Sequence, residues 1–422
     1  MNWKLPRVFY GWWVVGASFL IALYLGGVIF YGFTAFFEPI ANEFGWSYAQ
    51  ISLAASIRGL EMGLLAPLMG ILADRWGPRR LIFSGGVVTA LGLILLSRST
   101  SLTMFYGAFV LISTGMSFCS TTVLMTAVAN WFRSKVGLAT GIAISGFGFS
   151  GLLIPVIVKL IDMYEWRMTI TILALGMLAI ALPLSLLFRH KPEKYGYLPD
   201  GEVKDAFILD DGLAPLQTVE VDFKVKQALK TRLFWHITAA FTCFIMLVSS
   251  ITTHVMPYLS SIGVAKSTSS LVATAIPLMS IGGRLSLGWL GDKFDRRLVA
   301  ASAFAMMCFG ALCFGYASTI GTWLLVPFLI FFGMGYGGGT ALRPSLTRQF
   351  FGRTNFGTVL GLLIGINMLG SIIGPPLAGW VFDNWGSYQG IWFVLAGLAA
   401  AAIISVLTIP PVSTTVQLVD GA

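Results

Sequence analysis

One arginine in the middle of a long apolar stretch has the clearest chemical role in this sequence. Residues 271–290 carry apolar or small side chains around Arg284 and no other charged group. A guanidinium stays protonated at physiological pH, and its planar fork of N–H donors matches a carboxylate. Placing it near a bilayer centre costs about 2.5–3.5 kcal/mol on insertion scales, so such a residue indicates a functional site. We expect Arg284 to bind a small organic anion.

Two further polar side chains in apolar stretches are candidates for the same site. Tyr336, in the segment GMGYGGG, carries a hydroxyl that suits a ligand oxygen, and the glycines after it are expected to let the helix bend. Asn367 is the most central polar residue of residues 357–380, which contain no lysine or arginine. Because a second carboxylate without a cation would be costly to bury, one central cation favours a monocarboxylate.

Three arrangements are candidates for handling a proton. Histidine titrates near neutral pH, so His254 is a candidate pH sensor or donor to the substrate, with a structural role as an equal alternative. Arg58 and Glu61 are three residues apart and share one helix face. Two roles are expected for this pair. Either the two side chains form an internal ion pair, or Glu61 takes up and releases a proton and thereby unlocks Arg58. In the third arrangement the anion on Arg284 itself recruits the proton.

The elements that position these residues are membrane-spanning helices. Of the 422 residues, 56% are hydrophobic and only 11% are charged, against roughly 25% in ordinary soluble domains. About 20 apolar residues cross the hydrocarbon region as a helix. We expect twelve spans, near residues 10–37, 48–73, 80–98, 103–131, 136–161, 166–189, 232–260, 267–291, 297–316, 322–347, 356–381 and 387–409. The first is too long for the apolar core of a signal peptide.

The basic residues predict how the chain is oriented. Of the 27 lysines and arginines, twenty fall at the N-terminus, in the even-numbered turns and in the central loop, four fall on the opposite side and three lie within spans. This asymmetry places both termini in the cytoplasm. The net charge of +9 therefore indicates topology, and no nucleic-acid partner is expected. The four cysteines lie in apolar segments without metal-ligand spacing, so no metal or other cofactor is expected.

The two halves of the sequence repeat each other. Residues 111–124 align without gaps on residues 329–342, and GILADRWGPRR at 70–80 matches GWLGDKFDRR at 288–297 at the same displacement. Parallel duplication of six helices predicts a substrate site between the halves near the midplane. We expect an N-terminal bundle at 1–189, a cytoplasmic linker at 190–231 and a C-terminal bundle at 232–422.

The motif at residues 70–80 resembles the signature of the major facilitator superfamily. In such a motif Asp74 and the neighbouring arginines would form a charge network that holds one conformation shut. The stretches YGWWVV (10–15) and NWFRSKVGLATGIAISGFGFSG (130–151) are similar to those of its monocarboxylate transporter and oxalate/formate antiporter group. The resemblance implies an all-α membrane protein of twelve helices in two pseudo-symmetric bundles.

The same resemblance gives residue roles. In that group an arginine on the eighth helix pairs with the substrate carboxylate, and Arg284 matches its position. Tyr31 stands where animal members carry a lysine, and Ser280 stands where many carry an acidic residue. Both departures concern the group's proton-handling positions, which leaves the coupling mechanism open.

We predict a secondary transporter that moves a lactate- or pyruvate-like monocarboxylate with a proton across the cell (inner) membrane by rocking-type alternating access. It is expected to work as a monomer in the lipid bilayer and not as an enzyme. The main alternative is an exchanger of organic anions, of the oxalate/formate type. A multidrug exporter and a non-transporting nutrient receptor are further alternatives.

Overall fold

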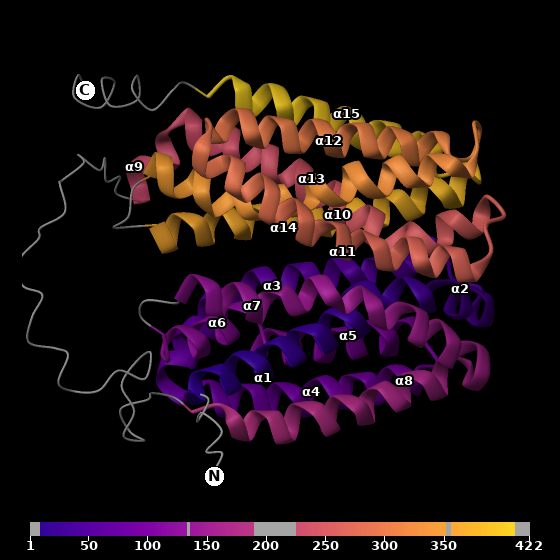
Figure 1. The fold of residues 1–422 in the computed structure, drawn as a ribbon. Coiled ribbons are helices and arrows are strands. Elements are labelled where there is room, and N and C mark those ends of the chain that lie inside the picture. Colours follow the sequence, from indigo (N-terminus) through magenta and orange to yellow (C-terminus); the bar gives the residue numbers. More distant parts are fainter. Residues whose placement is uncertain (1–8, 133–135, 190–224, 352–355, 410–422) are drawn as a thin grey trace, which may run out of the picture. The chain divides into compact units, whose positions relative to one another are not determined.

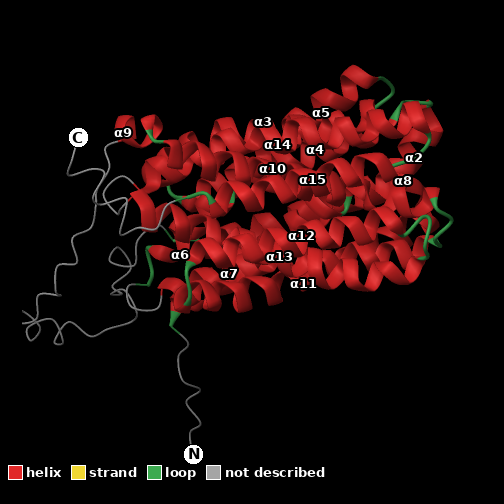
Figure 2. Cartoon of the chain, turned by 90° about the horizontal axis from the view of Figure 1, so that it is seen from above, coloured by secondary structure: helices red, strands yellow, loops and turns green. Residues whose placement is uncertain are grey.

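The computed structural model describes residues 9–132, 136–189, 225–351 and 356–409, and all regular structure in these ranges is helical (Figure 2). The first half contains α1 (Tyr10–Leu25), a π-helical turn at Gly26–Tyr31, α2 (Phe33–Phe44), α3 (Tyr48–Trp76), α4 (Pro78–Ser97), α5 (Leu102–Phe118), α6 (Thr121–Ala129), α7 (Val136–Phe149) and α8 (Leu153–Leu187). The second half contains α9 (Val225–Lys230), α10 (Arg232–Ser261), α11 (Lys266–Lys293), α12 (Arg296–Tyr316), α13 (Leu325–Phe351), α14 (Phe356–Trp385) and α15 (Gln389–Leu407).

The helices account for the twelve predicted spans. Ten segments of the described chain are long and apolar enough to cross a membrane. One of them, Ala139–Leu187, has 49 residues and is interrupted at Glu165, where φ is +61°, so it contains the predicted spans 136–161 and 166–189. The predicted span 48–73 corresponds to α3, which is less apolar and carries Arg58 and Glu61. The fold is therefore the predicted all-α arrangement of twelve spans.

The chain divides into two compact units. Each unit is made of segments that do not correspond exactly to one half of the sequence. Unit 1 comprises Met1–Phe30, Leu64–Ser150 and Leu160–Gln217, and unit 2 comprises Tyr31–Gly63, Gly151–Lys159 and Thr218–Ala422. The predicted division into bundles at 1–189 and 232–422 stays a prediction. Of the predicted linker, residues 190–224 lie outside the described residues, and α9 occupies most of the remainder.

Small residues set the helix contacts within each unit. In unit 1, Gly92 of α4 faces Ile112 of α5, leaving no room for a larger side chain. In unit 2, Gly310 of α12 faces Phe332 of α13 in the same way. Gly92 and Gly310 are separated by the displacement of the sequence repeat, so equivalent helix pairs pack through equivalent glycines.

The core of unit 2 is aromatic, and its helices run roughly along one direction (Figure 1). Tyr258, Phe314, Tyr388 and Trp392 form a buried cluster from α10, α12 and α15 with the residue before α15. The Tyr258 hydroxyl donates to the Phe314 carbonyl oxygen at 2.6 Å. This packing fixes α10 against the other helices, so that side chains projecting from α11, α13 and α14 hold defined positions.

The second copy of the signature motif ties helix ends together. Arg296 donates from Nε to the Gly291 carbonyl and from Nη1 to the Ser345 carbonyl. Arg297 bonds the Asp295 carboxylate and the Ile409 carbonyl. The Gly291 carbonyl lies in the last turn of α11 and the Ile409 carbonyl follows the end of α15, and carbonyls at such ends lack a partner in the helix, so arginine donors there are favourable. In the first copy, Asp74 lies in α3, and its side chain is outside the described part of the structure.

Candidate anion-binding site

Arg284 projects from α11 and is held by a hydroxyl group. Its Nε donates to Thr340 Oγ1 of α13 at 3.2 Å, and Thr340 donates onward to the Gly337 carbonyl at 2.7 Å. The side chain is partly buried, and no described residue accepts a hydrogen bond from its Nη1 or Nη2. The charge of Arg284 is thus positioned by a neutral partner, and the end of its fork remains available to a carboxylate.

Glycines bring α11 and α13 close enough for this contact. A Cβ at Gly337 would run into the backbone of Ser280, and a Cβ at Gly283 would run into the backbone of Met334. The helix α13 continues through Gly337, Gly338 and Gly339, which pack against neighbouring helices. These glycines serve close approach in this structure, and their role as a hinge stays a prediction.

Tyr31 and Tyr336 meet beside Arg284, although they are 305 residues apart in sequence. Their hydroxyl oxygens lie 2.9 Å apart, and both side chains are buried. Tyr31 ends the π-helical turn, a feature that is frequent at functional sites. The charges of Arg284 and Arg58 both act on the Tyr31 phenol. Unit 2 therefore gathers four of the predicted site residues into one polar cluster.

The predicted pair Arg58 and Glu61 lies in the part of α3 that belongs to unit 2. Arg58 is 5% exposed, and its charge interacts with Tyr31. The Glu61 carboxylate has one fully buried oxygen, Oε2, without a hydrogen-bond donor among the described residues. Both side chains are thus inside the unit, as their positions in an apolar helix predict, and their roles in proton handling stay a prediction.

His254 and Asn367 are also fully buried, away from solvent. The Nε2–H of His254 donates to the Pro375 carbonyl at 2.8 Å, and its Nδ1 accepts from the Tyr388 hydroxyl at 3.0 Å. Both ring nitrogens are therefore occupied by protein groups, and the choice between a proton-handling and a structural role of His254 stays a prediction. Asn367 accepts from Thr242 at 3.2 Å, while its Nδ2 has no acceptor in the described chain.

Two residues of α13 were not among the site residues predicted from the sequence. Thr340 orients Arg284, and Arg343 lies one turn further along the same helix. Nε and Nη1 of Arg343 are buried without an acceptor among the described residues. The available signal was the spacing of Tyr336, Thr340 and Arg343, which are four and three residues apart and so share one helix face.

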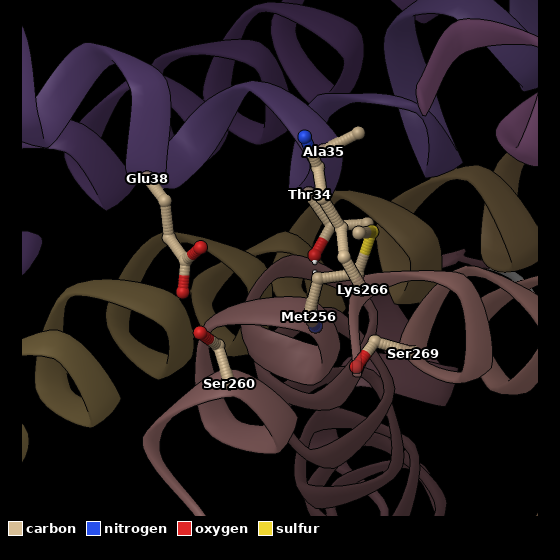
Figure 3. A pocket seen from close by; sticks show the side chains of 7 residues that line it. All are labelled: Thr34, Ala35, Glu38, Met256, Ser260, Lys266 and Ser269. Atoms are coloured by element: carbon tan, nitrogen blue, oxygen red, sulfur yellow. Dashed lines mark hydrogen bonds between the residues drawn. The ribbon is translucent and has the colours of Figure 1, made fainter. Parts of the chain in front are cut away.

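A small pocket of about 20 Å³ lies elsewhere in unit 2, between α2, the end of α10 and the start of α11. Figure 3 shows the Glu38 carboxylate pointing toward Ser260, with Lys266 and Ser269 on the α11 side. The Thr34 hydroxyl accepts from the Met256 backbone N–H at 3.1 Å and joins α2 to α10. The pocket shares no lining residue with the cluster around Arg284.

The helices α3 and α14 are held together at one end by a carboxylate. Asp383 accepts from the backbone N–H groups of Tyr48 and Ala49, at 3.0 and 2.9 Å. A carboxylate at a helix N-terminus satisfies donors that have no partner in the helix and complements the helix dipole. Further along, Ser56 donates to the Ile372 carbonyl. These contacts fix the part of α3 that carries Arg58 against α14 within unit 2.

A family model described as Major Facilitator Superfamily matches residues 17–283 and 250–419. The chain belongs to the Major Facilitator Superfamily. It is a multi-pass membrane protein, in agreement with its apolar helices. A nucleoside transporter, NupG, has a TM-score of 0.73 and 14% sequence identity, covering 94% of this chain and 99% of its own. A bacterial homologue of the human lysosomal transporter Spinster has a TM-score of 0.66 and is 16% identical in sequence. The match covers 96% of this chain and 95% of the homologue.

Curated relatives match nearly the whole chain at low identity. Monocarboxylate transporter 12 of Xenopus laevis is 26% identical over 97% of this chain and 93% of its own length. Monocarboxylate transporter 13 of Bos taurus is 26% identical over 95% of this chain and 89% of its own length. Monocarboxylate transporter 2 of Homo sapiens is 24% identical over 94% of this chain and 85% of its own length. The predicted resemblance to the monocarboxylate transporter group is confirmed.

Proposed function

We propose that this superfamily member transports a small monocarboxylate such as lactate or pyruvate, and that Arg284 binds the substrate carboxylate. The main support is the state of Arg284, whose Nε is held by the Thr340 hydroxyl while Nη1 and Nη2 meet no acceptor in the described chain. A guanidinium neutralised by a protein carboxylate would instead favour a structural role. The names of the curated relatives support the same substrate class.

The proposed cycle is alternating access with a proton carried in the same direction. The anion neutralises Arg284, the carrier closes around the pair, and the opposite side opens. Tyr31 and Tyr336 would contact the substrate oxygens, because their hydroxyls meet beside Arg284. Arg58, Glu61 and Asp74 remain candidates for gating or proton transfer. We place the protein in the cell inner membrane as a monomer, with both termini in the cytoplasm.

The carboxylate role of Arg284 is tested by uptake of labelled lactate into proteoliposomes that contain the purified protein. Arg284→Gln is expected to reduce uptake to the level of empty vesicles, because the neutral amide cannot pair with the anion. Arg98→Gln removes an exposed charge in unit 1 and is the matched control. Thermal melting checks that both variants are folded. Normal lactate uptake by Arg284→Gln would contradict the proposal.

The organic anion exchanger remains the second candidate, because charge balance at Arg284 is satisfied equally well by a returning anion. Net uptake into vesicles without internal anion, driven by an inward proton gradient, indicates symport. Strict dependence on an internal organic anion indicates exchange. The same vesicles distinguish the two mechanisms without any change to the protein.

A further inference from the structure

A second arginine of unit 2 carries buried nitrogens that lack an acceptor. Nε and Nη1 of Arg343 are fully buried, and nothing in the described chain accepts a hydrogen bond from them. No described carboxylate forms an ion pair with this side chain. Arginine cannot lose its charge in a protein, and a buried guanidinium with open donors is costly unless an anion meets it. The arrangement therefore favours an external anion at this position.

Arg343 belongs to the same helix face as the site already described. Tyr336, Thr340 and Arg343 follow each other at helical spacing on α13. Tyr336 bonds Tyr31, Thr340 holds Arg284, and the charge of Arg343 acts on Tyr336. Three residues of helix rise, about 4.5 Å, separate Thr340 from Arg343 along the axis. Arg284, through Thr340, and Arg343, through its charge interaction with Tyr336, are thus both associated with the hydroxyl groups on this face of α13.

We propose that Arg343 is a second anion-binding residue, so that the site accepts short dicarboxylates, such as succinate, in addition to monocarboxylates. This inference rests on the proposed function, because Arg284 must hold the first carboxylate. It revises the sequence-based expectation of one central cation, which counted Arg343 within a span and gave it no role. With a second guanidinium present, a second carboxylate is no longer without a partner.

The competing role for Arg343 is a gate. Glu61, an acidic residue of α3 that also belongs to unit 2, would be the partner of such a gate in another state of the cycle. A gate acts on every substrate alike, because it changes the carrier rather than the contact with the ligand. A specificity residue changes the ratio between ligands. The ratio of two affinities therefore separates the two roles.

The test compares butyrate and succinate, which share a four-carbon chain and differ in one carboxylate. Their affinities for the purified full-length protein are measured by calorimetry at about pH 7.5, where carboxyl groups are ionised. Arg343→Gln is expected to weaken succinate binding by at least about ten-fold, the usual effect of losing a hydrogen bond to a charged group. Butyrate binding is expected to change by less than about three-fold. Arg98→Gln is expected to change neither affinity.

Equal weakening of both acids by Arg343→Gln, or no weakening of either, would overturn the inference. If the Gln variant does not fold, Arg343→Lys is measured instead, and its succinate-to-butyrate ratio is expected to fall by about three-fold, because lysine keeps the charge without the planar fork. An unchanged ratio in that variant would count against the proposal equally. Failure of the proposed function has a separate signature, in which Arg284→Gln leaves butyrate binding unaffected.

Discussion

The hydroxyl of Thr340 is predicted to set substrate affinity by orienting Arg284. Thr340→Val removes the hydroxyl and preserves the branched shape, whereas Thr340→Ser keeps the hydroxyl and is the matched control. The bond that is lost joins Arg284 Nε to Thr340 Oγ1 at 3.2 Å, the long end of the usual range. Hydrogen bonds to charged groups contribute about 1.5–3 kcal/mol, so a bond of this length is assigned about 1.5 kcal/mol.

This energy limits the expected effect. If the hydroxyl fixes the guanidinium before the substrate arrives, its loss weakens carboxylate binding by at most about ten-fold. The KM for lactate uptake into proteoliposomes is therefore expected to rise by up to about ten-fold in Thr340→Val. The Ser variant is expected to stay within about two-fold of the unchanged protein, because its hydroxyl can accept the same bond.

The assay is the concentration dependence of labelled lactate uptake, with thermal melting as a check of the fold. A merely structural role of Thr340 would lower the melting temperature of the Val variant and reduce the amount of active protein without changing KM. A KM that is unchanged in both variants would refute the positioning role. It would also weaken the case for Arg284, whose only hydrogen-bond partner in the described chain is this hydroxyl.

Two predictions concern contacts outside the site. Asp383→Asn is expected to lower the melting temperature, because a carboxylate that caps α3 contributes about 1 kcal/mol; equal melting of this variant and the unchanged protein would show that the cap is dispensable. The hydrogen bond from Arg297 lowers the pKa of Asp295, so the ionised carboxylate adds stability above its ordinary pKa and loses this effect as pH falls through the lowered value. The difference in melting temperature between the protein and Asp295→Asn should therefore be largest near neutral pH and shrink below about pH 4; a difference that does not change with pH would contradict the pairing.

The hydropathy of the sequence predicted the helices well, because the backbone of a membrane-spanning segment must satisfy its own hydrogen bonds. The predicted span 297–316 corresponds to Arg296–Tyr316, and 232–260 corresponds to Arg232–Ser261. The first span was predicted to end at residue 37, but the helical path continues to Phe44. Its end is set by Gly45, whose φ of +65° favours glycine. Helix ends set by backbone conformation are less visible in hydropathy than apolar interiors.

The site was predictable only where a charge interrupts an apolar stretch. Arg284 and Arg58 were found in this way, and Tyr31 was found through the family resemblance. Thr340 was not found, because its spacing from Tyr336 and Arg343 indicates a shared helix face but not a contact with Arg284. Its partner depends on the close approach of α11 and α13, which Gly283 and Gly337 permit. Such a contact is a property of packing between distant segments.

The contrast between two arginines of unit 2 explains why an anion is needed. Arg297 is paired with the Asp295 carboxylate, so its charge is compensated by the protein itself. Arg284 is held by a hydroxyl, which fixes its geometry and leaves its charge uncompensated. Moving an uncompensated cation through a closed, poorly hydrated state is unfavourable, and a bound carboxylate removes this cost. A neutral partner on Arg284 therefore links anion binding to closure, whereas a protein carboxylate at the same place would let the empty carrier close freely.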